Sequence, residues 1–221
     1  MKECVICFYY HKICPVLREH LRLFRLHNPQ AVIVPLCLKG TDPLVEGSYV
    51  SSARDWPGGW FNADVAFTDW FLSPASIQAK RYFFFEYDTR CQEPLESFYA
   101  EVWDAEIARV ELWTMADNPD WSWWGQFDDR IPADERAGVC PWPGVMFSQD
   151  ALRSVCHEVQ KCEYFALHNE ARIGTAIHRL KIPHREIRPG VGNFLQCSER
   201  TPIKGHGIWH PVKKIPEYAL I

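Results

Sequence analysis

The sequence contains no run of lysine and arginine, and its 24 basic residues are outnumbered by 28 acidic ones, for a net charge of −4. Domains that bind nucleic acid normally carry a clustered excess of positive charge. No apolar stretch approaches the roughly 18 residues of a membrane-spanning helix. The opening residues, MKECVICFYYH, also lack the small-residue cleavage pattern of a secretory signal. We therefore expect no nucleic-acid partner, no membrane span and a cytoplasmic location.

The nine cysteines do not form a recognisable zinc-binding pattern. Cys4 and Cys7 make a CxxC, but they lie inside an apolar strand pattern, and no second CxxC or histidine pair at zinc spacing follows. An odd number of cysteines without an export signal is typical of a reduced protein with buried thiols. The sequence also lacks internal repeats and low-complexity linkers.

The hydrophobic pattern predicts alternating strands and helices. Residues 4–10 predict a buried strand, 15–27 a helix with Pro15 in its first turn, and 31–38 a second strand. Strand, helix and strand joined by short connections form a βαβ unit with parallel pairing. The remaining elements expected are helices over 62–73, 94–103 and 169–181, strands over 81–88 and 107–115, a short strand and then a helix capped by Ser148 over 143–160, and turn-rich loops over 40–60 and 118–138. This order predicts one α/β domain over residues 1–221, with a mostly parallel central sheet flanked by helices.

Two acidic residues follow the most apolar strand, in the segment RYFFFEYDTRC. Glu86 and Asp88 are two positions apart, so on a strand their side chains point the same way. They stand at the carboxyl end of the strand, where ligands bind in open α/β sheets. Two carboxylates this close favour a divalent cation between them, and their oxygens suit Mn²⁺ or Mg²⁺. A purely structural alternative is a pairing of Glu86 with Arg81 or Arg90, with Asp88 beginning a turn.

Together with the segments downstream, this motif resembles glycosyltransferases of the GT-A fold, especially small bacterial and viral ones. These enzymes carry a DXD-type acidic motif after a hydrophobic strand, and FFFEYDTRC fills that place with Glu86 instead of the first Asp. PGVMFSQDAL resembles the strand and helix that lead to the acceptor site, HNEARIGTAIHRL the segment that supplies a catalytic acid, and GHGIWHPVK the C-terminal segment whose histidine completes the metal site. The resemblance covers about residues 4–214. It implies a Rossmann-like GT-A domain, with a nucleotide-binding half over about 1–90 and an acceptor-binding half over about 91–221.

The resemblance assigns the metal and donor residues. Asp88 is expected to be the principal metal ligand, Glu86 to bind the metal through water or to hold the donor ribose, and His210, with His206 as second choice, to be the C-terminal ligand. The alternative for His210 is a surface position in a Gly/Pro-rich tail. The remaining donor contacts expected are Lys213 on the diphosphate, Tyr9, Tyr10 and His11 at the base and ribose, and Asn62 and Asp64 at the nucleotide. Core packing for Tyr9 or Tyr10 and a helix cap at Asp64 are the alternatives.

Glu170 is the expected catalytic base. An inverting sugar transfer needs a carboxylate to take the proton of the acceptor hydroxyl. Acidic residues are also common in the first turn of any helix, so a structural role beside an Asn169 cap is the alternative. The acceptor contacts are expected in WSWWGQFDD, because indole faces pack on sugar rings and carboxylates accept bonds from hydroxyls. The residues concerned are Trp123, Trp124, Asp128 and Asp129, and burial of some of these tryptophans in the core is the alternative.

These expectations describe a metal-dependent enzyme that moves a sugar from a UDP- or GDP-sugar to a hydroxyl of a carbohydrate or another acceptor, with inversion. The second hypothesis is a catalytically inactive GT-A-like domain that binds a carbohydrate or a partner protein, which the replacement by Glu86 permits. A nucleotidyltransferase is disfavoured, because the first strand is followed by HKICP and not by a glycine-rich, basic phosphate loop.

Overall fold

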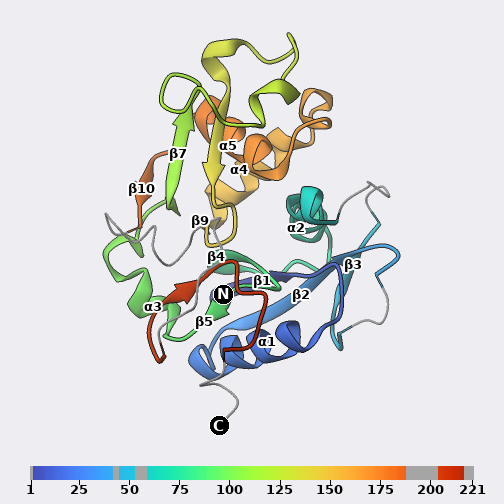
Figure 1. Ribbon diagram of the computed structural model, residues 1–221, viewed down its shortest axis with the longest axis vertical. Coiled ribbons are helices and arrows are strands. Elements are labelled where there is room, and N and C mark those ends of the chain that lie inside the picture. The colour runs from blue at the N-terminus through green and yellow to red at the C-terminus, as the bar shows by residue number, and fades with distance from the viewer. Residues whose placement is uncertain (1, 42–44, 53–58, 188–203, 217–221) are drawn as a thin grey trace.

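The structure is a computed structural model, and it describes residues 2–41, 45–52, 59–187 and 204–216. Seven strands form one central sheet in the order β10-β6-β9-β4-β1-β2-β3 (Figure 1). Within this sheet only β9 runs antiparallel to its neighbours, so the expected α/β fold with a mostly parallel sheet is confirmed. The strands are β1 (Lys2–Tyr9), β2 (Val32–Leu38), β3 (Tyr49–Ser51), β4 (Ala79–Glu86), β6 (Ile107–Arg109), β9 (Met146–Ser148) and β10 (His184–Glu186).

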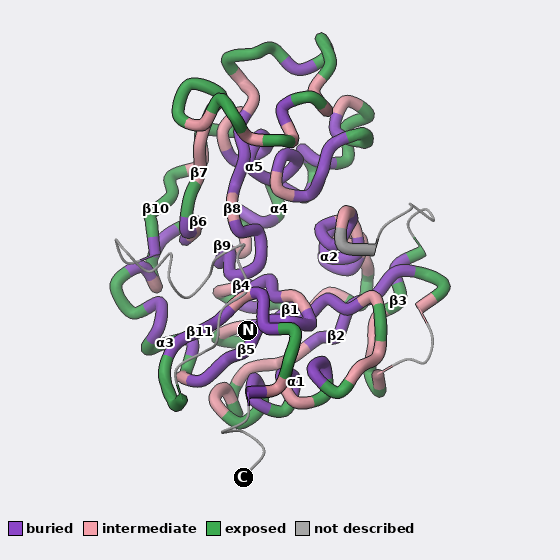
Figure 2. Tube along the Cα trace, viewed as in Figure 1, coloured by how far each residue is buried: buried purple, intermediate pink, exposed green. Residues whose placement is uncertain are grey.

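Helices cover both faces of the sheet. On one face lie α1 (Pro15–His27) and α3 (Leu95–Phe98), and on the other lie α2 (Ala63–Leu72), α4 (Gln149–Val159) and α5 (Asn169–Leu180) (Figure 1). Strand β1 is buried on both sides because its apolar residues alternate between the two layers. Val5, Cys7 and Tyr9 pack with α2, α4 and α5, whereas Ile6 and Phe8 pack with α1 and α3. Figure 2 shows β1 and β4 as buried along most of their length.

The C-terminal part of the described chain returns to the centre of the molecule through a very short pairing. Strand β11 (Ile208–Trp209) pairs antiparallel with β5 (Arg90–Cys91), which directly follows the turn after β4. Two further hydrogen bonds extend this contact, from the amide of Gln92 to the carbonyl of Gly207 and from the amide of Val212 to the carbonyl of Asp88. The pairing therefore brings the segment around His210 to the carboxyl end of β4.

Several expected elements differ from those observed. The loop expected over 40–60 contains β3, and the helix expected over 94–103 is only α3 followed by a 3₁₀ turn, η2 (Ala100–Val102). The strand expected over 107–115 is two strands, β6 and β7 (Glu111–Thr114), because β7 leaves the central sheet to pair with β8 (Ala137–Cys140). Ser148 caps α4 as expected, since its hydroxyl accepts from the amide of Ala151. The other 3₁₀ turns are η1 (Gly59–Asn62), η3 (Trp124–Gln126), η4 (Ala133–Glu135) and η5 (Cys162–Tyr164).

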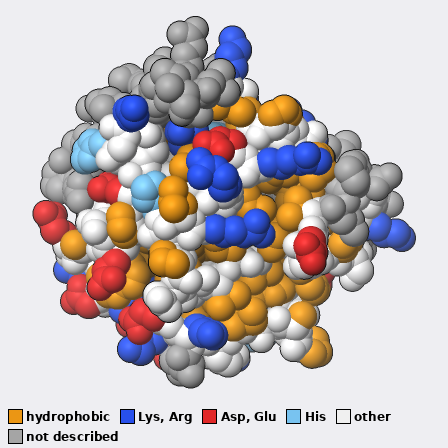
Figure 3. All heavy atoms as spheres, turned by 90° about the horizontal axis from the view of Figure 1, so that it is seen from below, with side chains coloured by type: hydrophobic (Ala, Val, Ile, Leu, Met, Phe, Trp, Pro, Cys, Tyr) orange, Lys and Arg blue, Asp and Glu red, His pale blue; other side chains and the backbone are white. Residues whose placement is uncertain are grey.

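The free thiols and the mixed charge of the surface agree with what the composition predicts. All eight cysteines within the described residues are free, and Cys4 and Cys7 pack into different core layers. Among the described helices none is long and apolar enough to cross a membrane. On the face seen from below, basic side chains are interspersed with hydrophobic and acidic ones (Figure 3).

Candidate functional site

A cavity of about 470 Å³ lies at the carboxyl ends of β1 and β4. Strand pairing places Tyr9 opposite Glu86, so the residues that follow both strands meet at this edge of the sheet. Segments from the C-terminal region and from the start of α5 form the other walls. The described residues that line the cavity are His11, Lys12, Glu86, Tyr87, Asp88, Trp123, Trp142, Pro143, His168, Asn169, Glu170, His210, Pro211 and Lys213.

Glu86, Asp88 and His210 form a compact cluster on one wall. One ligand atom from each of the three lies within 4.8 Å of the other two. His210 Nε2 is 3.3 Å from Asp88 Oδ1 and 3.6 Å from Glu86 Oε2. Glu86 therefore faces His210 rather than an arginine, since Arg81 donates to the carbonyl of Trp103 and Arg90 lies 3.8 Å from Glu19. His206 is half exposed and lies 4.0 Å from Glu93, so it is His210 that joins the cluster.

The three charges of the cluster depend on one another. Burial disfavours a charge on His210, but the hydrogen bonds and negative charges of Asp88 and Glu86 prevail and raise its pKa to about 10. Burial also raises the pKa of Glu86. Burial also acts to raise the pKa of Asp88. The hydrogen bond and the positive charge of His210 outweigh that effect, so the pKa of Asp88 lies below its ordinary value. In this state an imidazolium at His210 offsets one of the two carboxylate charges.

The same donor set fits a divalent cation. Two carboxylates offer hard oxygen ligands, and a neutral imidazole adds a nitrogen that Mn²⁺ accepts more readily than Mg²⁺ does. The cluster is enclosed, with the side chains of Glu86, Asp88 and His210 exposed by only 14%, 6% and 11%. A divalent cation that replaces the proton of His210 would balance both carboxylate charges. The described residues can thus hold Mn²⁺ or Mg²⁺.

Glu170 lies across the cavity at the start of α5. Its carboxylate accepts hydrogen bonds from the thiol of Cys140 and the backbone amide of Trp142, and its side chain is 13% exposed. Burial raises the pKa of Glu170 to about 7, and the negative charge of Glu86 acts in the same direction. A carboxylate with this pKa is suited to taking up a proton near neutral pH.

A buried ion pair holds the start of α5. Arg172 Nε lies 3.2 Å from Asp64 Oδ2 at the start of α2, and both side chains are almost completely buried. The same guanidinium donates to Asn62 Oδ1 at 3.0 Å and to the carbonyl of Leu167 at 2.6 Å. Asn62 and Asp64, expected to contact the nucleotide, thus bind Arg172 and do not line the cavity. Helix α5 begins at Asn169 as expected, but its cap is His168 and not Asn169, since the His168 ring accepts from the amide of Glu170.

The residues at the end of β1 divide between core and cavity. Tyr9 is fully buried among the residues that pack with α2, and Tyr10 is fully buried with its hydroxyl at Ser48 Oγ and the amide of Val45. Core packing, the alternative noted for one of the two, therefore holds for both. His11 lines the cavity, as does Lys213, which places a positive charge near the acidic cluster.

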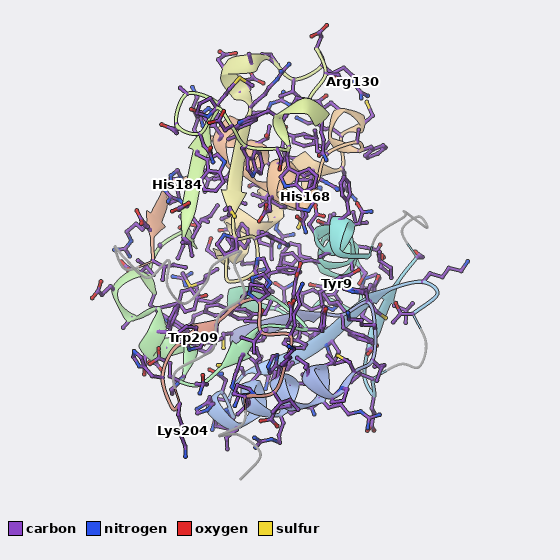
Figure 4. The ribbon with its side chains drawn as sticks, in the orientation of Figure 1. Tyr9, Arg130, His168, His184, Lys204 and Trp209 are labelled. Atoms are coloured by element: carbon purple, nitrogen blue, oxygen red, sulfur yellow. The ribbon has the colours of Figure 1, made fainter. Side chains whose placement is uncertain are left out.

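Of the four expected acceptor residues, Trp123 alone is among the described residues that line the cavity. Its indole stacks on the imidazole of His168, with ring centroids 4.4 Å apart and planes 9° apart. Trp124 is buried and donates to the carbonyl of Asn118. Asp128 forms an exposed pair with Arg130, which lies at the outer end of the molecule, far above His168 (Figure 4). Asp129 is exposed as well.

Lys12, His168 and Trp142 are among the cavity residues that the sequence did not predict. Lys12 lies shortly after the end of β1, beyond His11, and places its ammonium 5.1 Å from the centre of the Tyr87 ring. The rule that ligands bind beyond strand ends would have found it. His168 precedes the predicted helix start, whose cap position was assigned one residue late. Trp142 carried no signal, because its place in the wall depends on the path of the chain between β8 and β9.

No protein-family model matches the chain, and no curated protein matches its sequence. Function is therefore inferred from the site itself.

Proposed function

We propose that this protein is a metal-dependent glycosyltransferase of the GT-A type, which moves a sugar from a UDP- or GDP-sugar to a hydroxyl of a carbohydrate or another acceptor. One observation carries the proposal. The acidic motif after β4, the acid at the start of α5 and the C-terminal histidine are far apart in the sequence, yet all three line one cavity. The resemblance implied a role for each of them in a single reaction.

The cluster of Glu86, Asp88 and His210 is the proposed cation site. When bound, Mn²⁺ or Mg²⁺ supplies positive charge that stabilises the diphosphate as it departs from the sugar. Lys213 and Lys12 stand beside the cluster and provide mobile positive charges for the same diphosphate. His11, at the same strand end, is proposed to contact the donor as well.

Glu170 is the proposed general base. It takes the proton of the acceptor hydroxyl, and the acceptor oxygen then bonds to the anomeric carbon as the bond from that carbon to the diphosphate breaks. Attack opposite to the leaving group inverts the anomeric configuration. Cys140 and the amide of Trp142 orient the carboxylate of Glu170, and Trp123 with His168 offers an aromatic wall for the acceptor.

A binding domain without catalysis is the second candidate. The raised pKa of His210 favours it, because a protonated imidazole offsets part of the negative charge of Glu86 and Asp88 without a cation. Such a domain has no use for the base-like environment of Glu170. Turnover therefore separates the two candidates.

The test is the release of nucleoside diphosphate from a panel of UDP- and GDP-sugars, with and without carbohydrate acceptors, in Mn²⁺, Mg²⁺ or EDTA. The proposal expects release from at least one donor, loss of release in EDTA, and loss in Asp88→Asn. Asp120→Asn removes an exposed carboxylate outside the cavity and serves as the matched control, with full activity expected. No release from any donor, together with no metal-dependent stabilisation by any nucleotide, would favour the binding domain.

A further inference from the structure

Helix α1 supports the acidic turn from the sheet face opposite α5. His20, in the middle of α1, is fully buried, and its Nδ1 lies 3.1 Å from the carbonyl oxygen of Tyr87. That carbonyl belongs to the peptide that joins Tyr87 to Asp88. A second contact supports the same turn, because Glu19 on α1 lies 3.8 Å from Arg90.

The chemistry of this contact fixes the state of the imidazole. A carbonyl oxygen only accepts hydrogen bonds, so His20 Nδ1 carries the hydrogen and donates it. Burial lowers the pKa of His20 to about 4, which keeps the ring neutral near neutral pH. His20 therefore donates a hydrogen bond without adding a charge beneath the cluster of Glu86, Asp88 and His210.

The three successive carbonyls of the turn are each held by a different donor. The carbonyl of Glu86 accepts from the amide of Thr89 at 2.8 Å, and that of Asp88 accepts from the amide of Val212 at 2.7 Å. The carbonyl of Tyr87, between them, accepts from His20. The outer two donors are backbone amides of the turn and of the C-terminal segment. The central donor is a side chain, so its identity depends on the residue at position 20.

We propose that His20 is a positioning residue for the cation site, holding the Tyr87 peptide so that the carboxylates of Glu86 and Asp88 converge on His210. The inference rests on the proposed metal site. Rotation of the Tyr87–Asp88 peptide would turn Asp88, whose Cα is bonded to the nitrogen of that peptide, and would displace Tyr87, which links it to Glu86. Loss of partners that orient metal ligands typically weakens metal affinity by about 10–100-fold.

The test compares variants with and without a donor at this position. In His20→Asn the side-chain amide nitrogen takes nearly the place of Nδ1 and can donate, whereas His20→Leu and His20→Phe remain apolar and cannot. Leu21→Val, a core change at the next position of α1, is the matched control for packing. For each protein the dissociation constant for Mn²⁺ is measured by the paramagnetic resonance signal of free Mn²⁺, and the melting temperature is measured without metal.

We expect Mn²⁺ binding at least tenfold weaker in whichever of the Leu and Phe variants folds, and within about threefold of wild type in His20→Asn, since orienting partners act in this range. Leu21→Val should lower the melting temperature and leave Mn²⁺ affinity unchanged. Unchanged Mn²⁺ affinity in His20→Leu or His20→Phe would overturn the positioning role of His20 but not the cation site. A loss of affinity in His20→Asn as large as in the apolar variants would do the same. A wild-type protein that binds no Mn²⁺ would overturn the cation site and this inference with it.

Discussion

His210 Nε2 lies 3.3 Å from Asp88 Oδ1, although Asp88 follows β4 and His210 lies near the end of the described chain. The contact depends on the antiparallel pairing of β11 with β5, which places Trp209 opposite Arg90. His210 follows Trp209 and therefore lies beside the turn that precedes Arg90. Neither residue alone makes a cation site. Together with Glu86 they combine two carboxylates with one imidazole in an enclosed place.

Binding of Mn²⁺ should release a proton. The pKa of His210 is raised to about 10, so its ring is protonated at pH 7 to 8 and must lose that proton to become a ligand. Affinity should therefore rise with pH, by up to about tenfold for each unit, because one proton leaves for each ion bound. Calorimetric titration in two buffers of different ionisation enthalpy measures the number of protons. Binding without proton release would contradict the assignment of His210 as a ligand.

Glu170→Gln should abolish most of the proposed sugar transfer. General-base catalysis typically contributes about 10²–10⁴-fold to rate, and the glutamine amide cannot accept the proton. In the wild-type enzyme kcat/KM should fall about tenfold per pH unit below pH 7 and level off above it, because the pKa of Glu170 is raised to about 7 and only the ionised form is a base. A variant that keeps a rate within a few-fold of wild type would show that Glu170 is not the base.

The same substitution should stabilise the fold at alkaline pH. The folded-state pKa of about 7 lies above the ordinary glutamate value of 4.5, so the folded protein binds the proton more tightly than the unfolded chain. The stability that comes from protonated Glu170 is present below pH 4.5 and is lost as pH rises to 7. Glu170→Gln should thus be more stable than wild type at pH 8, by at most about 3 kcal/mol, and similar at pH 4.5. Denaturant unfolding at both pH values measures the difference in the free energy of unfolding. A Glu170→Gln variant less stable than wild type at pH 8 would contradict the prediction.

Gly174→Ala should destabilise the protein and disturb the site. A Cβ at Gly174 would lie 2.5 Å from the carbonyl carbon of Gly138, because α5 packs with its backbone against β8. Overpacking of this kind costs about 1–3 kcal/mol or more, which exceeds the roughly 1 kcal/mol that alanine gains over glycine in a helix. Gly125→Ala is the control, since a Cβ there meets nothing within 4 Å. Thermal unfolding of both variants checks the prediction, and an unchanged Gly174→Ala would refute it.

The central part of the fold could be predicted because its signals are local. The runs CVICFYY and RYFFFEYD are apolar enough to be read as buried parallel strands, and the position of Glu86 and Asp88 follows from the end of the second run. Ser148 was predictable as a cap for the same reason. The cavity lies where the general rule for open α/β sheets puts it.

The remaining features depend on partners that are distant in the sequence. Asp64 looked like a nucleotide contact or a helix cap, and no local pattern reveals that Arg172 reaches it across the core. The two-residue strands β5 and β11 are too short to give a periodic signal, so the resemblance and not the pattern pointed to His210. The contact of His20 could not be predicted for a related reason. An isolated histidine on a helix gives no indication of the carbonyl that it faces.

The most direct test of the cation site is equilibrium binding of Mn²⁺ to the wild-type protein and to Asp88→Asn at pH 8, followed by the paramagnetic resonance signal of free Mn²⁺. Glu93→Gln, which removes a carboxylate near His206 and outside the cluster, is the control. We predict one saturable site in wild type and in the control, and affinity at least tenfold weaker in Asp88→Asn. Equal binding in all three proteins, or none in any, would contradict a divalent cation at Glu86, Asp88 and His210.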